Sequence, residues 1–116
     1  MPSYQVNKAG VDQARALIDK GQYDDATEWS DAAPSAQDGN AEIEKHGYEE
    51  YGAWYLAIDT EASEETKSRY AFPYGDFKEV NRAALIHAKQ RATQNDHDNI
   101  ARAADELLDH LDQKRS

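Results

Sequence analysis

The stretch RYAFPYGDFKEV, residues 69–80, gathers four of the eleven aromatic residues of the chain: Tyr70, Phe72, Tyr74 and Phe77. Pro73 fixes its own φ and disfavours helical backbone at Phe72, so the chain here is predicted to be extended. In extended backbone, successive side chains point to opposite sides. Two interpretations stay open: the rings close a small core, or they line a recognition groove in which phenol hydroxyls meet water.

Directly after these rings, the sequence predicts the start of a helix. Gly75 permits a turn, and Asp76 and Glu79 have the spacing of a capping box. Both carboxylates also favour the positive end of a helix. We therefore expect a helix over residues 77–94. Its apolar residues lie on more than one side, which indicates a central helix that several neighbours contact.

Two further helices follow from caps and apolar periodicity. Asn7 is a favoured N-cap residue and Gly21 occupies a C-cap position, so the sequence predicts a helix from Asn7 to Lys20. A helix over residues 99–113 has the clearest pattern, because its apolar residues recur at helical spacing. These residues are Ile100, Ala103, Ala104, Leu107, Leu108 and Leu111.

The middle of the chain is less regular. Residues 22–36 contain Pro34 and small polar residues, which indicates a loop pinned by Tyr23 and Trp29. Ser35 and Asp38 have the spacing of a capping box and predict that a second helix begins there, with a break expected at Gly47.

The stretch YEEYGAWYLAI, residues 48–58, places Tyr48, Tyr51 and Tyr55 on one face of a continuing helix. Residues 63–66 can cap a short helix that ends near Tyr70.

No segment alternates convincingly between apolar and polar residues at period two. The predicted fold is therefore all-α, an irregular bundle of four to five helices joined by an extended aromatic linker. The length of 116 residues fits a single helical domain over 1–116, with residues 1–6 and 114–116 frayed. Leu, Ile, Val and Phe number only 16, so a core rich in aromatic residues and alanine is expected.

Charge and composition exclude several classes of function. The formal net charge of −10 disfavours direct binding to nucleic acid or to anionic membranes. The chain has no apolar run long enough to span a membrane. The absence of cysteine excludes disulfides and thiolate metal sites. We expect a cytoplasmic protein whose acidic surface suits a basic protein partner, or a homodimer formed through apolar faces of the 77–94 helix.

The histidines do not form a recognisable metal site. No pair has the spacing of a helical zinc site, and helix capping explains Asp96-His97-Asp98 better than a calcium loop does. The sequence also lacks a P-loop, a dinucleotide fingerprint and a nucleophile elbow. It therefore predicts no metal, no cofactor and no catalytic residue, and the absence of catalytic signatures favours a binding protein over an enzyme.

One face of the predicted 77–94 helix brings His87 and Arg91 together. With Asp76 or a tyrosine hydroxyl nearby, such a cluster could bind an anion or take part in acid–base chemistry. The alternative is a histidine bonded to a carboxylate beside an arginine in a surface ion pair.

Four segments of the chain together resemble a family of small uncharacterised bacterial proteins. They are QVNKAGVDQARALIDKGQY, YEEYGAWYLAID, EETKSRYAFPYGDFKEVNRAALI and AADELLDHLD, and they cover most of residues 4–112. Similar segments occur in some prophage-encoded proteins. The resemblance implies a stand-alone bacterial protein and no catalytic residue.

Two functional hypotheses follow. In the first, a small acidic binding protein engages its partner through six residues: Tyr70, Phe72, Tyr74, Asp76, His87 and Arg91. In the second, the protein is a small enzyme or an anion binder in which His87, Arg91, Tyr74 and Asp76 converge in one pocket.

Overall fold

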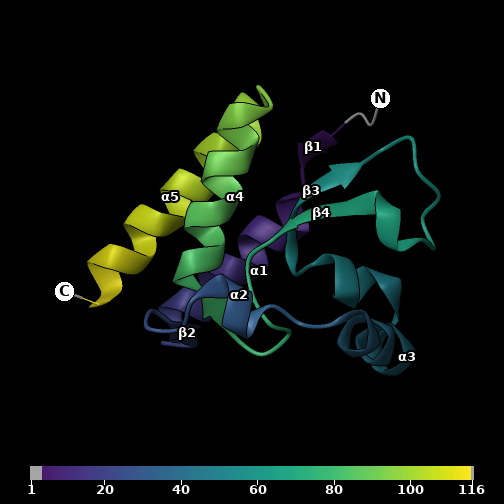
Figure 1. Ribbon diagram of the computed structural model, residues 1–116, viewed down its shortest axis with the longest axis horizontal. Helices are drawn as coiled ribbons and strands as arrows, with labels where there is room; N and C mark the ends of the chain where they lie inside the picture. Colours follow the sequence, from purple (N-terminus) through teal and green to yellow (C-terminus); the bar gives the residue numbers. More distant parts are fainter. Residues whose placement is uncertain (1–3, 116) are drawn as a thin grey trace.

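The computed structural model describes residues 4–115 and has both helices and strands (Figure 1). The elements in chain order are β1 (Tyr4–Val6), α1 (Lys8–Asp19), β2 (Tyr23–Asp24), α2 (Trp29–Ala32), α3 (Ala36–Gly52), β3 (Tyr55–Asp59), the 3-10 turn η1 (Lys67–Arg69), β4 (Tyr70–Pro73), β5 (Val80–Asn81), α4 (Arg82–Gln94) and α5 (Asp98–Arg115).

The prediction of an all-α helical bundle is wrong. Strands β1, β3 and β4 form a three-stranded antiparallel sheet with β3 in the centre, and β2 pairs with β5 in parallel. The sheet joins segments that lie far apart in the sequence, since Tyr4 pairs with Asp59 and Tyr55 pairs with Pro73. Local periodicity cannot show such pairing, and each strand is too short to alternate visibly.

The stretch from residue 48 to 58 is a helix only in its first half. Asn7 ends it, because its buried side chain donates hydrogen bonds to the carbonyls of Gly52 (2.9 Å) and Tyr55 (3.0 Å). The backbone N–H of Asn7 also donates a hydrogen bond to the Leu56 carbonyl at 2.8 Å. These long-range bonds replace continued helix bonding, so the chain leaves α3 and enters β3.

Helices α4 and α5 form an antiparallel pair, and α1 lies between this pair and the sheet (Figure 1). The apolar face predicted for the last helix is confirmed, because all six of its residues are buried. The core also contains Ile18 of α1, Leu56 of β3, Tyr74, Val80 and Leu85 of α4. Alanines such as Ala84, Ala88 and Ala92 let α4 approach its neighbours closely.

The helix predicted from residue 77 begins only at Arg82. Asp76 does accept hydrogen bonds from the amides of Lys78 and Glu79, both at 3.0 Å, but these bonds close a tight turn. Phe77 within this turn has a φ of 69°, which is incompatible with a right-handed helix. The N-cap of α4 is Asn81, whose side chain accepts from the Ala84 amide.

In the middle of the chain, the predicted start and break of the second helix are confirmed, and the predicted loop before it is only partly correct. Ser35 and Asp38 form the capping box expected at the start of α3. Gly47 interrupts α3 with a φ of 84°. The loop predicted over residues 22–36 is wrong in part, because it contains β2 and α2.

The ends of the chain also differ from the prediction of frayed segments. Tyr4–Val6 is strand β1, and residues 114–115 continue α5. Residues 1–3 and 116 lie outside the described residues.

Most of the aromatic residues pack together in one group, here called the inner ring cluster. It consists of Tyr51, Trp54, Tyr55, Tyr70, Tyr74 and Phe77, whose neighbouring ring centroids lie 5.0–6.1 Å apart. Gly52 makes this packing possible, because a Cβ there would collide with the Tyr70 ring. The expectation of a core rich in aromatic residues and alanine is correct only in part, because the buried residues include seven alanines and three aromatic residues but also eight Ile, Leu and Val residues.

Candidate functional site

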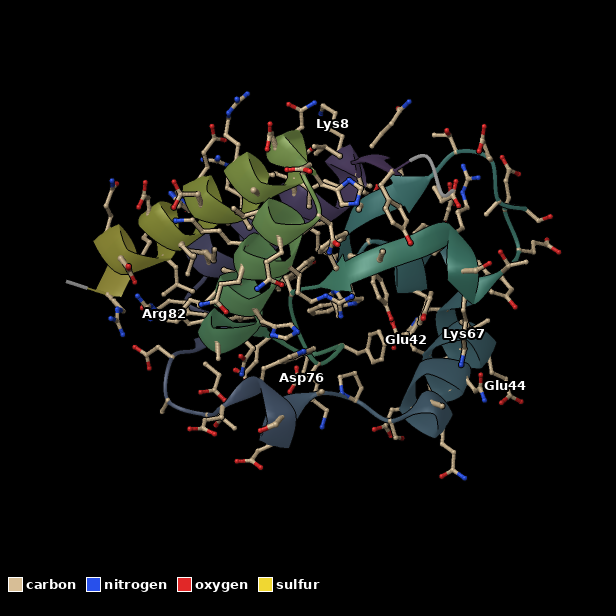
Figure 2. The ribbon with its side chains drawn as sticks, turned by 45° about the horizontal axis from the view of Figure 1, so that its top comes forward. Lys8, Glu42, Glu44, Lys67, Asp76 and Arg82 are labelled. Carbon is tan, nitrogen blue, oxygen red and sulfur yellow. The ribbon has the colours of Figure 1, made fainter. Side chains whose placement is uncertain are left out.

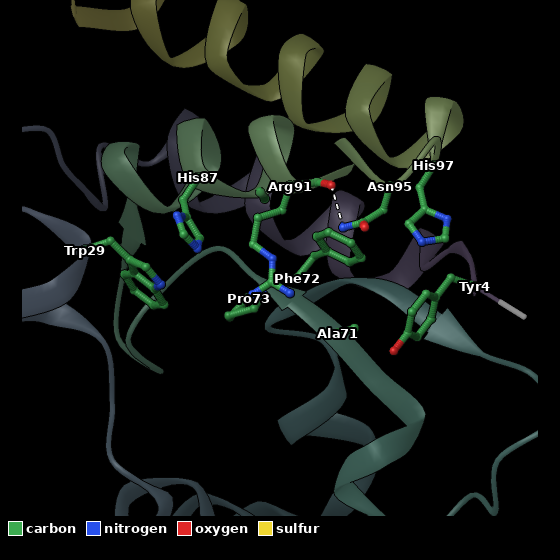
Figure 3. A pocket seen from close by; sticks show the side chains of 10 residues that line it. Tyr4, Trp29, Ala71, Phe72, Pro73, His87, Arg91, Asn95 and His97 are labelled. Carbon is green, nitrogen blue, oxygen red and sulfur yellow. Dashed lines mark hydrogen bonds between the residues drawn. The ribbon is translucent and has the colours of Figure 1, made fainter. Parts of the chain in front are cut away.

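A cleft of about 490 Å³ lies between strand β4 and helix α4 (Figure 3). Its size falls within the range of about 300–1,000 Å³ that small-molecule sites occupy. Strand β4 supplies one wall, α4 the other, and β1, α2 and the α4–α5 turn close the ends. The lining residues are Tyr4, Trp29, Ala71, Phe72, Pro73, His87, Ala88, Arg91, Asn95 and His97.

Three rings pack edge to face at one end of the cleft. The centroid of Tyr4 lies 6.0 Å from Phe72 and 5.4 Å from His97, and Phe72 lies 5.9 Å from His97. Trp29 and His87 occupy the other end, and the Arg91 side chain extends between the two ends towards Pro73 (Figure 3). The cleft thus combines apolar rings with groups that can donate hydrogen bonds.

The backbone places the Phe72 ring in the cleft at a cost. Phe72 has a φ of 62°, a left-handed conformation that a bulky residue rarely adopts. The extended backbone predicted at this position is therefore wrong for Phe72 itself, although β4 as a whole is extended. Such a conformation costs on the order of 1–3 kcal/mol and persists only where the surrounding structure enforces it. The contacts of the ring with Tyr4 and His97 provide that enforcement.

The charge of the cleft is opposite to that of the chain. None of its ten lining residues is Asp or Glu, although the chain has 23 acidic residues among 116. Four other hollows on the described surface each include at least one carboxylate. Acidic side chains such as Glu42, Glu44 and Asp76 lie elsewhere on the surface (Figure 2).

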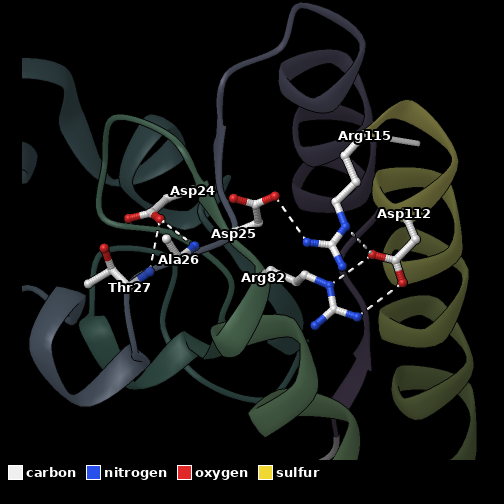
Figure 4. Close-up of polar contacts among 7 residues, drawn as sticks. All are labelled: Asp24, Asp25, Ala26, Thr27, Arg82, Asp112 and Arg115. Atoms are coloured by element: carbon white, nitrogen blue, oxygen red, sulfur yellow. Dashed lines mark hydrogen bonds and ion pairs between the residues drawn. The ribbon is translucent and has the colours of Figure 1, made fainter.

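The two arginines of α4 differ in their partners. Near the start of the helix, Arg82 holds Asp112 with two hydrogen bonds of 2.8 and 3.1 Å, and Arg115 contacts both Asp112 and Asp25 (Figure 4). The Arg82 guanidinium lowers the pKa of Asp112. Within residues 4–115, the Arg91 guanidinium has no such carboxylate partner. Its five donors are therefore available to a ligand.

The sequence-predicted site residues separate into two groups. Phe72, His87 and Arg91 line the cleft together. Within the described residues neither His87 nor Arg91 forms an ion pair with a carboxylate, so the alternative of a surface ion pair at these positions is wrong.

Tyr70, Tyr74 and Asp76 lie elsewhere. Tyr70 packs against Tyr51 and Tyr55 in the inner ring cluster. Tyr74 is fully buried, stacks on Trp54, and donates its hydroxyl to the Ala53 carbonyl at 2.7 Å. Burial raises the pKa of the Tyr74 phenol. Asp76 closes its own tight turn, so the four-residue cluster of the enzyme hypothesis does not form.

Sequence reasoning did not connect Tyr4, Trp29, Asn95 and His97 with the cleft. The position of Asn95 was predictable, because His87, Arg91 and Asn95 follow one another at intervals of four residues and so lie on one face of the helix and its C-cap. Its side chain donates to the Arg91 carbonyl at 2.9 Å (Figure 3). Tyr4 and Trp29 reach the cleft only through the tertiary fold, so no local pattern marks them.

Two features of the described residues limit the kind of site that is possible. Within residues 4–115, no group of three or more His, Asp or Glu side chains is arranged to hold a metal ion. No helix of that part of the chain has the length and apolar character needed to cross a membrane. Comparisons with protein-family models, with curated proteins and with solved structures give no match to this chain.

Proposed function

We propose that this protein is a non-enzymatic binding protein that holds the anionic group of a small ligand in the cleft between β4 and α4. The observation that carries the proposal is the position of Arg91. Among residues 4–115 it has no carboxylate partner, and it lines a cleft whose lining residues include no carboxylate, on a chain of net charge −10.

The chemistry of the lining favours an anion. A guanidinium presents its donors in a planar fork that matches carboxylate and phosphate oxygens. His87 and Asn95 add further groups able to donate. The other hollows on the described surface each include a carboxylate, whereas an incoming anion meets none among the residues that line the cleft.

The same lining supports binding over catalysis. Acid–base chemistry by His87 would require a second group to orient the imidazole or to share the proton. Tyr74 and Asp76, the residues expected to do so, are engaged in the inner ring cluster and in the Asp76 turn. The groups that remain in the cleft can position a ligand but include no carboxylate base.

A cytoplasmic location and a bacterial origin belong to this proposal as well. The cysteine-free composition is compatible with that location. A basic protein partner would meet the acidic surface outside the cleft, where carboxylates are numerous (Figure 2).

The test is a titration of isotope-labelled protein with benzoate and with inorganic phosphate, followed by amide chemical shifts. We expect shifts at Phe72 and along Ala88–Asn95, and Arg91→Gln should weaken binding about tenfold or more. Arg102→Gln is the matched control, because Arg102 is an exposed residue of α5 outside the cleft. Equal binding by the Arg91→Gln variant and the wild type would overturn the proposal.

A further inference from the structure

Trp29 differs in its packing from Trp54, the other tryptophan of the chain. It is half-buried, yet it does not pack against the apolar core. Trp54, by contrast, is 8% exposed and stacks on Tyr74 at 5.4 Å. Within the described residues, the Trp29 indole contacts no other aromatic ring, and it lines the cleft beside His87. The Trp29 indole thus presents a large apolar surface at the cleft that no other described aromatic ring packs against.

The segment that carries Trp29 is held in place by the same residue that starts α4. Asn81 is 1% exposed, accepts from the Ala84 amide at 2.8 Å, and donates to the Thr27 carbonyl at 3.1 Å. The Asp24 carboxylate accepts hydrogen bonds from the backbone amides of Ala26 and Thr27, which holds the turn before Trp29 (Figure 4). One buried side chain thus joins the 24–29 segment, which leads into Trp29, to the start of α4, the helix that carries Arg91.

The rings at the other end of the cleft are less available. Tyr4, Phe72 and His97 already contact one another edge to face. A planar ligand group gains most from a ring whose face is not already used, because stacking replaces water on both surfaces. Of the five aromatic rings among the described lining residues, Trp29 and His87 contact no other ring, and Trp29 offers the larger face.

We infer that the ligand of the cleft carries a flat aromatic ring beside its anionic group, with the ring stacked on Trp29 and the anion held by Arg91. This inference rests on the proposed function and names its ligand class. Figure 3 shows His87 between the Trp29 and Arg91 side chains, with Arg91 extending towards Pro73. An aromatic carboxylate and a nucleoside monophosphate share the required chemistry.

The experiment compares matched probes that differ only in the ring. Benzoate is compared with cyclohexanecarboxylate, and adenosine monophosphate with ribose phosphate. Affinities are measured by calorimetry, and the Trp29 indole N–H signal is followed by NMR after its assignment with Trp29→Phe. We expect the aromatic member of at least one pair to bind about tenfold more tightly and to shift the Trp29 signal. The pair that shows this preference identifies the source of the ring.

Variants separate the contribution of the ring from that of the charge. Trp29→Leu should remove the preference for the aromatic probe, and Trp29→Phe should retain part of it. Both substitutions leave the core untouched, since Trp29 lies outside it. Arg91→Gln should weaken both members of a pair by a similar factor.

The outcomes distinguish the inference from the proposed function. Equal binding within both pairs that still depends on Arg91 would overturn the inference and leave the proposed function in place. A preference that survives Trp29→Leu would overturn the assignment of the ring to Trp29. If none of the four probes shows binding that depends on Arg91, both the proposed function and the inference are overturned.

Discussion

Phe72 and Tyr74 are two residues apart in the same segment, yet their rings enter opposite environments. The Tyr74 ring is fully buried in the inner ring cluster, where its hydroxyl bonds to a backbone carbonyl. The Phe72 ring is half-buried: it packs against the core and also lines the cleft. One short aromatic segment therefore contributes to the core on one side and to the candidate site on the other.

The two environments also differ in how their backbone is formed. Tyr74 continues the sheet, since its amide donates to the Trp54 carbonyl at 3.2 Å. Phe72 has left-handed backbone instead, and a Leu56–Phe72 pair is missing from the register of β3 and β4. Left-handed backbone also occurs on the core side, at Phe77 of the inner ring cluster with a φ of 69°, so the contrast in backbone holds between Phe72 and Tyr74 and not between the two environments as a whole.

The largest expected effect is the loss of stability on truncating Tyr74. Tyr74→Ala removes a buried ring and its hydrogen bond, so the free energy of unfolding should fall by about 3–5 kcal/mol. Phe72→Gly should cost only about 1 kcal/mol, because the lost ring is half-buried and glycine relieves the left-handed backbone. Urea unfolding of the two variants measures both values. Similar losses would mean that Phe72 belongs to the core as much as Tyr74 does.

A second prediction concerns Asn7, which attaches the end of α3 to β3 beside the inner ring cluster. Asn7→Asp should lower the free energy of unfolding by about 1–3 kcal/mol, because a carboxylate cannot donate to the carbonyls of Gly52 and Tyr55. If Asn7 acted only as an N-cap, aspartate would replace it without loss.

Ser35→Asp is the control for that prediction in the same unfolding assay. Ser35 caps α3 through its side chain, and aspartate is an equally favoured cap, so the change should be within about 0.5 kcal/mol. Tolerance of aspartate at both positions would show that the bonds from Asn7 contribute little.

The helices were predictable where a single segment carries its own pattern. The apolar face of α5 and the capping box at Ser35 involve residues within a few turns of each other, so spacing alone reveals them. The spacing of Tyr51 and Tyr55 wrongly predicted that both lie on one face of a single helix. Their hydroxyls do meet, at 2.8 Å, but Tyr51 lies in a helix and Tyr55 in a strand. The same separation in sequence fits both arrangements.

The strands and part of the cleft were not predictable from local pattern. Strand β1 has three residues, and its partner lies more than fifty residues away. His87 and Arg91 could be placed together because they share a helix face, whereas Trp29 and Tyr4 are brought to them by the fold. Sequence thus indicates His87, Arg91 and Phe72 of the cleft, and tertiary structure adds Trp29 and Tyr4, which complete its aromatic ends.

The smallest expected effect is the loss of stability at alkaline pH from buried phenols on the core side. Burial raises the pKa of Tyr55 and Tyr74 above the usual value of 10.0, and in Tyr55 the hydrogen bond with Tyr51 acts in the same direction. Their contribution is fully present below pH 10 and is lost as the pH rises towards the pKa of the folded state, because the unfolded chain ionises first. The free energy of unfolding should fall by on the order of 1 kcal/mol over the first pH unit above 10. Tyr55→Phe, which cannot ionise, should reduce this slope. An absorbance titration in which all seven tyrosines ionise together before unfolding would show that the inner ring cluster is open to water and that the two environments do not differ.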